Sequence, residues 1–167
     1  MDKTIIIYGS TSGNCESIAQ RIAAALGVEA SSVVSASALT PALIDENTNL
    51  LLGSSTWGCG DLQDEWYDAI EVIRASDLSG KTVAVFGCGD SSGFSTTFCD
   101  AMATIYDAAK NAGARMIGAV STDGYTYDDS TAVVDGEFVG LALDEDNESD
   151  LTDGRIAAWV ESIKPEL

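Results

Sequence analysis

Short apolar runs alternate with segments of helical periodicity along the whole chain. The first run, KTIIIY at residues 3–8, is rich in β-branched residues and ends at Gly9, which is typical of a strand buried on both faces. We expect such strands at residues 3–8, 50–54, 81–86 and 114–121, with a weaker one near 32–35.

The intervening segments carry apolar residues on one helical face. Ile18, Ile22 and Leu26 recur every four residues and predict a helix that Gly27 can terminate. Thr40 and Pro41 are typical of the cap and first turn of a short helix. Further helices are expected at 63–75, 95–112 and 152–163.

This alternation predicts an α/β domain with a parallel sheet and helices on both faces. Right-handed crossovers bring the carboxyl ends of the strands to one edge, where open α/β sheets bind ligands. Residues 123–143 interrupt the rhythm with aromatic and acidic side chains, and we expect an insertion there. We therefore expect residues 1–167 to form a single domain.

Composition excludes several classes of function. The formal net charge is −19, from 27 acidic and 8 basic residues, which disfavours nucleic acid and anionic membranes as partners. The same charge favours basic protein faces, although solubility alone would also explain it. The chain has no histidine, which excludes Ser–His and Cys–His catalysis, and we expect no metal site and no catalytic residues.

The cysteines and the N-terminus indicate the cellular compartment in which we expect the protein. The four cysteines form no Cys-x-x-Cys pair, so we expect free thiols in a reducing environment. No run of 18 apolar residues is present, and the first apolar run is too short for a signal peptide. We expect a cytoplasmic protein.

The loop Gly9–Cys15 joins the first strand to the first helix and suits a phosphate. Its glycines allow close backbone approach, its hydroxyls can donate hydrogen bonds, and a helix N-terminus follows it. It contains no Lys or Arg and matches neither a nucleoside-triphosphatase loop nor a dinucleotide fingerprint. The alternative is that this loop is only a structural turn and binds no phosphate.

Two further loops follow strands and carry aromatic residues between glycines. Trp57 lies in the loop 55–61, and Phe94 ends the segment 87–94. Aromatic side chains at this edge of the sheet are well placed to stack on a planar ring, although Trp57 could instead cover a loop hinge. Together the three loops predict a site for a planar, phosphorylated cofactor.

The segments GSTSGN, TWGCGDLQDEW and FGCGDSSGF, and the stretch from STDGY to AAWV, resemble the long-chain flavodoxins. The resemblance covers nearly the whole chain. It implies a three-layer flavodoxin-like fold with a five-stranded parallel sheet of order 2-1-3-4-5 and an insertion in the last strand.

The resemblance also implies a bound flavin mononucleotide (FMN). Residues 10–15 would hold the phosphate, Thr56 and Asp146 would lie near the ribityl chain, and Trp57 and Phe94 would cover the two ring faces. The full set of implied cofactor-binding residues is Ser10, Thr11, Ser12, Gly13, Asn14, Cys15, Ser55, Thr56, Trp57, Gly58, Cys59, Gly60, Cys88, Gly89, Asp90, Phe94, Thr97 and Asp146.

Several residues depart from the usual pattern of the family. Cys15 stands where a Thr is usual, and because a thiol is a weak donor we expect somewhat weaker phosphate binding. Phe94 replaces a Tyr, Asp61 a Glu and Thr97 an Asn. These departures bear on the redox potentials rather than on the identity of the cofactor.

The function that the resemblance implies is electron transfer rather than catalysis. The flavin would cycle mainly between semiquinone and hydroquinone, as a low-potential one-electron carrier between redox proteins. We expect a monomer and basic-faced partners such as a ferredoxin/flavodoxin–NADP reductase. Two alternatives belong to other classes. An FMN-dependent quinone or nitro-reductase shares the fold but needs room over the flavin, which Trp57 and Phe94 would cover. A phosphorylated receiver domain needs an acidic pair after the first strand, which GSTSGN does not supply.

Overall fold

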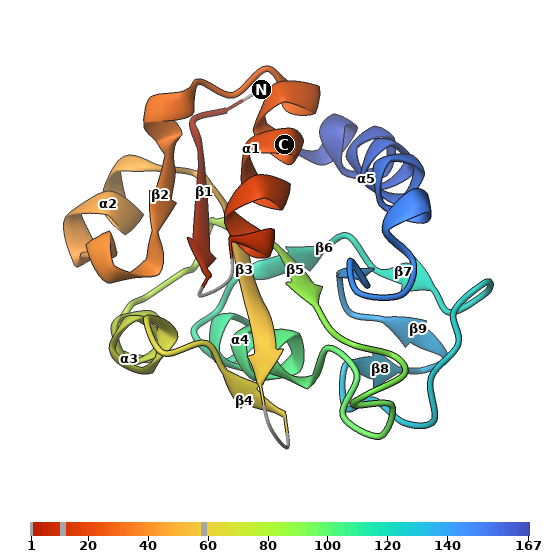
Figure 1. Cartoon of the computed structure of the whole chain (residues 1–167). Helices are drawn as coiled ribbons and strands as arrows, with labels where there is room; N and C mark the ends of the chain where they lie inside the picture. The colour runs from red at the N-terminus through yellow and green to blue at the C-terminus, as the bar shows by residue number, and fades with distance from the viewer. Residues whose placement is uncertain (1, 11–12, 58–59) are drawn as a thin grey trace.

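A computed structural model describes residues 2–10, 13–57 and 60–167 of the chain. Its central sheet is built from β1 (Thr4–Gly9), β2 (Val33–Ser35), β3 (Asn49–Trp57), β5 (Thr82–Cys88), β6 (Arg115–Ile117) and β10 (Leu141–Leu143). The strand order is β2–β1–β3–β5, and β6 and β10 both pair with β5 at the far edge (Figure 1). All of these pairings are parallel, which confirms the predicted 2-1-3-4-5 order with a fifth strand in two parts.

Helices cover both faces of this sheet. On one face lie α1 (Asn14–Leu26) and α5 (Ser149–Ile163), and on the other α3 (Trp66–Ala75) and α4 (Asp100–Asn111), with the short α2 (Pro41–Glu46) beside them (Figure 1). Short 3₁₀ turns occupy Ala30–Ser32, Ala36–Ala38 and Lys164–Glu166. None of the helices described is both long enough and apolar enough to cross a bilayer.

Strand residues divide alternately between two hydrophobic cores. Ile5 and Ile7 pack with α3 and α4, whereas Ile6 packs with α1 and α5. Leu51 and Phe86 belong to the second core with Ile6, and all of these side chains are buried. Because successive strand residues face opposite sides, a continuous apolar run is the pattern required in a sheet covered on both faces.

The predicted caps of two helices are confirmed. Gly27 ends α1 with φ 77°, a left-handed conformation that glycine adopts without steric cost. The Thr40 hydroxyl accepts a hydrogen bond from the Leu43 N–H at 3.3 Å, and Pro41 occupies the first turn of α2.

Three helix starts differ from the prediction. α3 begins at Trp66 rather than 63 because the Gln63 side chain accepts the Glu65 N–H at 2.8 Å in a turn. α4 begins at Asp100 rather than 95, after Cys99 adopts a positive φ of 55°. α5 begins at Ser149, three residues before the predicted start, which the sequence hid because this first turn lacks apolar periodicity.

The prediction that residues 123–143 are all insertion is wrong at its end, and the expected strand 114–121 is too long. The chain leaves the sheet after Ile117 at Gly118, which has φ 91° and whose carbonyl accepts the Trp159 indole N–H at 2.9 Å. Residues 118–140 contain a separate sheet of order β7–β9–β8, formed by β7 (Val120–Ser121), β8 (Val133–Val134) and β9 (Glu137–Phe138). The chain then rejoins the main sheet as β10.

Gly140 allows this return. A Cβ at this position would lie 2.0 Å from the Val85 carbonyl oxygen, so the backbone reaches β5 more closely than a side chain would permit. β10 is only three residues long, which is why its strand character is hidden in the sequence.

Candidate cofactor-binding site

Four loops meet at the carboxyl edge of the sheet. Three of them follow β1, β3 and β5, as the sequence predicts. The fourth, residues 144–148, follows β10; only Asp146 of this loop was expected, from the family resemblance, because β10 was assigned to the insertion.

The loop after β1 forms a tight turn into α1. The Ser10 hydroxyl accepts the Gly13 N–H at 3.0 Å, and Gly13 caps the helix with φ 91°. Because glycine has no side chain, the N–H groups of the first turn of α1 are left to an outside acceptor. Thr11 and Ser12 lie outside the described residues.

Cys15 points into the protein rather than towards the loop. Its side chain is fully buried, and its thiol donates to the Cys88 Sγ at 3.2 Å. The hydrogen bond between the two thiols, followed by burial, raises the pKa of the Cys88 thiol well above its usual value, because both favour its neutral form. The backbone of Cys15, not its thiol, lies in the turn that could face a phosphate.

The loop after β3 is a hairpin. Thr56 pairs with Leu62, and the backbone of Trp57 pairs with Asp61, where β4 (Asp61–Leu62) runs antiparallel to β3. The Thr56 hydroxyl accepts the Ala101 N–H at 3.1 Å and so anchors the start of α4. Its own proton remains able to donate. The Trp57 side chain, Gly58 and Cys59 lie outside the described residues.

The loop after β5 is organised around Asp90. The Asp90 carboxylate accepts the N–H groups of Ser92 at 3.0 Å and Gly93 at 2.8 Å, and the Asn147 side-chain amide at 2.8 Å. The Gly93 N–H and then the Asn147 amide lower the pKa of Asp90 because they stabilise its charged form. This arrangement closes the turn that presents Phe94.

Asp144 anchors the fourth loop to the third. It is fully buried, accepts the Ser91 N–H at 3.1 Å and the Ser91 hydroxyl, and accepts the Asn147 N–H at 3.0 Å. The Asn147 amide bonds to Asp144 as well as to Asp90, so one side chain bridges the two loops. Glu145 forms an ion pair with Arg21 of α1 at 3.4 Å.

A cavity of about 240 Å³ lies among these loops. It is lined by Asn14, Ser55, Thr56, Cys88, Gly89, Asp90, Phe94, Glu145 and Asp146. Sequence reasoning named all of these except Glu145. The predicted residues Ser10, Gly13, Cys15, Gly60 and Thr97 lie in the same loops but are not among those that line it.

The walls of the cavity combine an aromatic ring with negative charge. The Phe94 side chain is 49% exposed although it is large and apolar. Removal of Asp146 from water, followed by the charges of Asp90, Asp144 and Glu145, raises the pKa of Asp146. An aromatic face beside uncapped helix N–H groups fits a planar, phosphorylated ligand, and the acidic rim opposes any further negative charge placed there.

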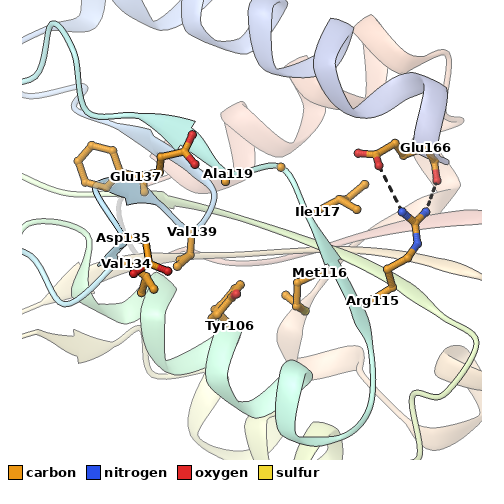
Figure 2. A pocket seen from close by; sticks show the side chains of 12 residues that line it. Tyr106, Arg115, Met116, Ile117, Ala119, Val134, Asp135, Glu137, Val139 and Glu166 are labelled. Carbon is orange, nitrogen blue, oxygen red and sulfur yellow. Dashed lines mark hydrogen bonds and ion pairs between the residues drawn. The ribbon is translucent and has the colours of Figure 1, made fainter.

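A larger cavity of about 410 Å³ lies at the other edge of the insertion (Figure 2). Tyr106 of α4, Met116 of β6 and Val134 of the insertion line it, and an Arg115–Glu166 ion pair of 3.3 Å closes one end. It is lined by β6, which pairs with the amino-terminal half of β5, and not by the loops at the carboxyl edge of the sheet.

Comparison with known proteins identifies the family. Residues 6–159 match the family model described as Flavodoxin. The chain is 41% identical to the flavodoxin of Helicobacter pylori over 98% of both chains. It is 39% identical to that of Nostoc sp. (strain PCC 7120 / SAG 25.82 / UTEX 2576), over 100% of this chain and 99% of that one.

Solved structures agree. The structure of Fusobacterium nucleatum flavodoxin bound to flavin mononucleotide superposes with a TM-score of 0.93 at 28% identity, covering 100% of this chain and 99% of that one. Oxidised flavodoxin 2 of Bacillus cereus gives a TM-score of 0.73 at 25% identity over 99% of both chains. Sequence, fold and the position of the cavity are consistent: this chain belongs to the flavodoxin family.

Proposed function

We propose that this chain is an FMN-based electron carrier, not an enzyme, and that its cofactor occupies the cavity at the carboxyl edge of the sheet. One observation carries the proposal: the cavity collects residues from the first turn of α1, the carboxyl ends of β3 and β5, and the loops after β5 and β10. The Fusobacterium nucleatum protein, with a TM-score of 0.93, is a flavodoxin bound to flavin mononucleotide.

Each loop has a distinct role in this proposal. The residues 10–15, through the first-turn N–H groups of α1, hold the phosphate. Thr56 and Asp146 lie along the ribityl chain, and Cys88, Gly89 and Asp90 border the pyrimidine edge of the ring. Phe94 and Trp57 cover the ring faces, Gly58–Gly60 pass its central edge, and Ser55 and Thr97 support these loops.

The bound flavin supplies the capacity to accept and release electrons one at a time. The chain's own groups set how readily it does so. Asp90, Glu145 and Asp146 place carboxylates around the cavity, which disfavours a negatively charged, fully reduced cofactor. A reduced cofactor held there is therefore a strong reductant, which supports a low-potential carrier.

Stepwise anaerobic reduction of the FMN-loaded protein, followed by visible absorption, tests this function. We expect a one-electron-reduced flavin with a long-wavelength band before full reduction. Direct two-electron reduction together with NADH-driven turnover would identify a reductase instead. No flavin bound after addition of FMN would contradict the proposal altogether.

The domain organisation, oligomeric state, cellular compartment and partners are part of the same proposal. Residues 1–167 act as one domain, as a monomer in the cytoplasm, without nucleic acid or membrane as partners. The net charge of −19 suits redox proteins with basic docking faces, such as a ferredoxin/flavodoxin–NADP reductase. Electron transfer to such a partner should slow steeply between low and physiological ionic strength; a rate independent of salt would contradict the electrostatic docking.

A further inference from the structure

Two cysteines distant in sequence meet beneath the cavity. Cys15 lies in the first turn of α1, and Cys88 is the last residue of β5. Their sulfur atoms are 3.2 Å apart across a separation of 73 residues. A disulfide requires about 2.05 Å, so the two sulfurs need approach by only about 1 Å.

The two thiols differ in access. Cys15 is fully buried, whereas Cys88 is 6% exposed and lines the cavity of about 240 Å³. The opening of that cavity carries the half-exposed Phe94 and the exposed Asp146. A small oxidant that enters the cavity therefore reaches Cys88 first and Cys15 only through it.

The third described cysteine is placed differently. Cys99 is fully buried in the core with α3 and α4, on the opposite face of the sheet from Cys15 and Cys88. Its thiol lies 3.9 Å from the Leu143 carbonyl oxygen. Cys99 thus serves as a matched control for a buried thiol outside the pair.

We propose that Cys15 and Cys88 are a peroxide-reactive pair that closes to an intramolecular disulfide in the apoprotein and is shielded when flavin is bound. The shielding rests on the proposed function, because it requires the cofactor in this cavity. Formation of the disulfide in the apoprotein does not depend on the proposed function. It would tie the helix of the phosphate loop to the end of β5.

The chemistry balances with hydrogen peroxide as the oxidant. The Cys88 thiolate attacks one peroxide oxygen, the O–O bond breaks, and after uptake of one proton the products are a sulfenic acid and one water. Because the pKa of the Cys88 thiol is raised, this step is slow at neutral pH and becomes faster as the pH rises. The Cys15 sulfur then attacks the Cys88 sulfur, the S–O bond breaks, and the hydroxyl leaves as a second water with the Cys15 proton. Two thiols are oxidised by two electrons, and one peroxide is reduced to two waters.

The test treats the reduced apoprotein with hydrogen peroxide over a time course and measures intact mass under denaturing conditions. We expect a loss of about 2 Da and of two titratable thiols, reversed by dithiothreitol. Methionine oxidation adds mass and is therefore separable. Trypsin leaves Cys88 and Cys99 in one peptide, so a second cleavage before Asp90 is needed to show that Cys15 is joined to Cys88.

Variants locate the reaction. The loss of about 2 Da should persist in Cys59→Ser and Cys99→Ser and disappear in Cys15→Ser and Cys88→Ser. Circular dichroism checks that each variant folds, and the peptide map of the wild-type chain decides the pairing without any variant. Unchanged mass, a disulfide through Cys59 or Cys99, or peroxide products on Cys88 with Cys15 left free would overturn the proposal.

A parallel arm contains FMN, with its binding verified by the visible spectrum. Bound flavin should slow disulfide formation at least about tenfold, since a covered thiol is reached only after the cofactor dissociates. Bound flavin with an unchanged rate would overturn the shielding. If FMN does not bind, the proposed function fails, while the apoprotein arm still decides whether the pair forms a disulfide.

Discussion

The insertion contacts the loop after β5, where the Asp128 and Asp129 N–H groups donate to the Ser95 carbonyl oxygen, but the insertion and the cofactor loops are held in different ways. In the insertion, Tyr125, Tyr127 and Phe138 pack with Phe98, and we call these four rings the aromatic cluster. Ring centroids are 4.7 Å apart for Tyr125 and Phe138 and 5.6 Å apart for Phe98 and Tyr127. Phe138 is fully buried.

The cofactor loops instead depend on polar contacts. Asp90 and Asp144 accept hydrogen bonds from backbone N–H groups and from Asn147. Phe94, the one large apolar side chain among the described residues that line the cavity, is 49% exposed. Burial of apolar area contributes to stability, whereas an exposed ring contributes little until a ligand covers it. Stability and cofactor binding should therefore respond to different residues.

The largest effect is expected from Phe138→Ala. Removing a fully buried ring from the aromatic cluster should lower the free energy of unfolding by about 3–5 kcal/mol. The affinity of the folded protein for FMN should change little. Urea unfolding and FMN titration check both parts; a loss below about 1 kcal/mol would show that the cluster is not an important source of stability.

Asp144→Ala should have the next largest effect. It leaves the Ser91 and Asn147 N–H groups without their acceptor, which should cost about 1–3 kcal/mol and also weaken FMN binding. Asp150→Ala, at an exposed position in α5, is the control for loss of one negative charge. Equal stability of the two variants would contradict an anchoring role for Asp144.

Phe94→Ala should separate binding from folding. Because the ring is half-exposed, the free energy of unfolding should stay within about 0.5 kcal/mol of the wild type. The loss of a stacking face should weaken FMN binding by about tenfold. Phe94→Tyr, which keeps the ring, serves as the control, and unchanged affinity in Phe94→Ala would show that this ring does not cover the flavin.

The smallest effect is expected from Asp146→Asn. Burial and neighbouring carboxylates raise the pKa of Asp146, so its ionised form is less favourable in the folded protein than in the unfolded chain. Its contribution to stability is therefore present at low pH and lost as the pH rises through the folded pKa.

At pH 7 the Asn variant should be more stable than the wild type by a few tenths of a kcal/mol, because exposed charges are well screened. The difference should shrink near pH 4 and in about 0.5 M salt. Urea titrations at these conditions measure it, with Asp64→Asn as a control on an exposed site elsewhere. A variant less stable than the wild type at pH 7 would contradict the sign.

Much of the fold could be predicted because buried parallel strands leave a strong local pattern. The run from Ile5 to Ile7 and the helical face of Ile18 and Ile22 required no tertiary information. β10 could not be found, because a three-residue strand that pairs with β5 across an insertion has no periodicity of its own. For the same reason Glu145 was not predicted, and Asp146 of the fourth loop was expected only from the family resemblance.

The thiol pair shows a second limit of sequence reasoning. Cys15 and Cys88 are 73 residues apart and were interpreted as separate thiols, since no local spacing signals that β5 ends beside the first turn of α1. Similarly, the expectation that the Cys15 thiol faces the phosphate came from the family resemblance, in which Cys15 occupies the position of a Thr. The structure instead gives that thiol a buried partner.

The most direct test of the cofactor site compares backbone amide NMR spectra of the isotope-labelled apoprotein before and after addition of FMN. We predict that the shifted signals concentrate on Asn14, Ser55, Thr56, Cys88, Gly89, Asp90, Phe94, Glu145 and Asp146. Signals from Tyr106, Met116 and Val134, around the cavity in Figure 2, should not move. Shifts centred on that second cavity, or no shifts at all, would contradict the central claim.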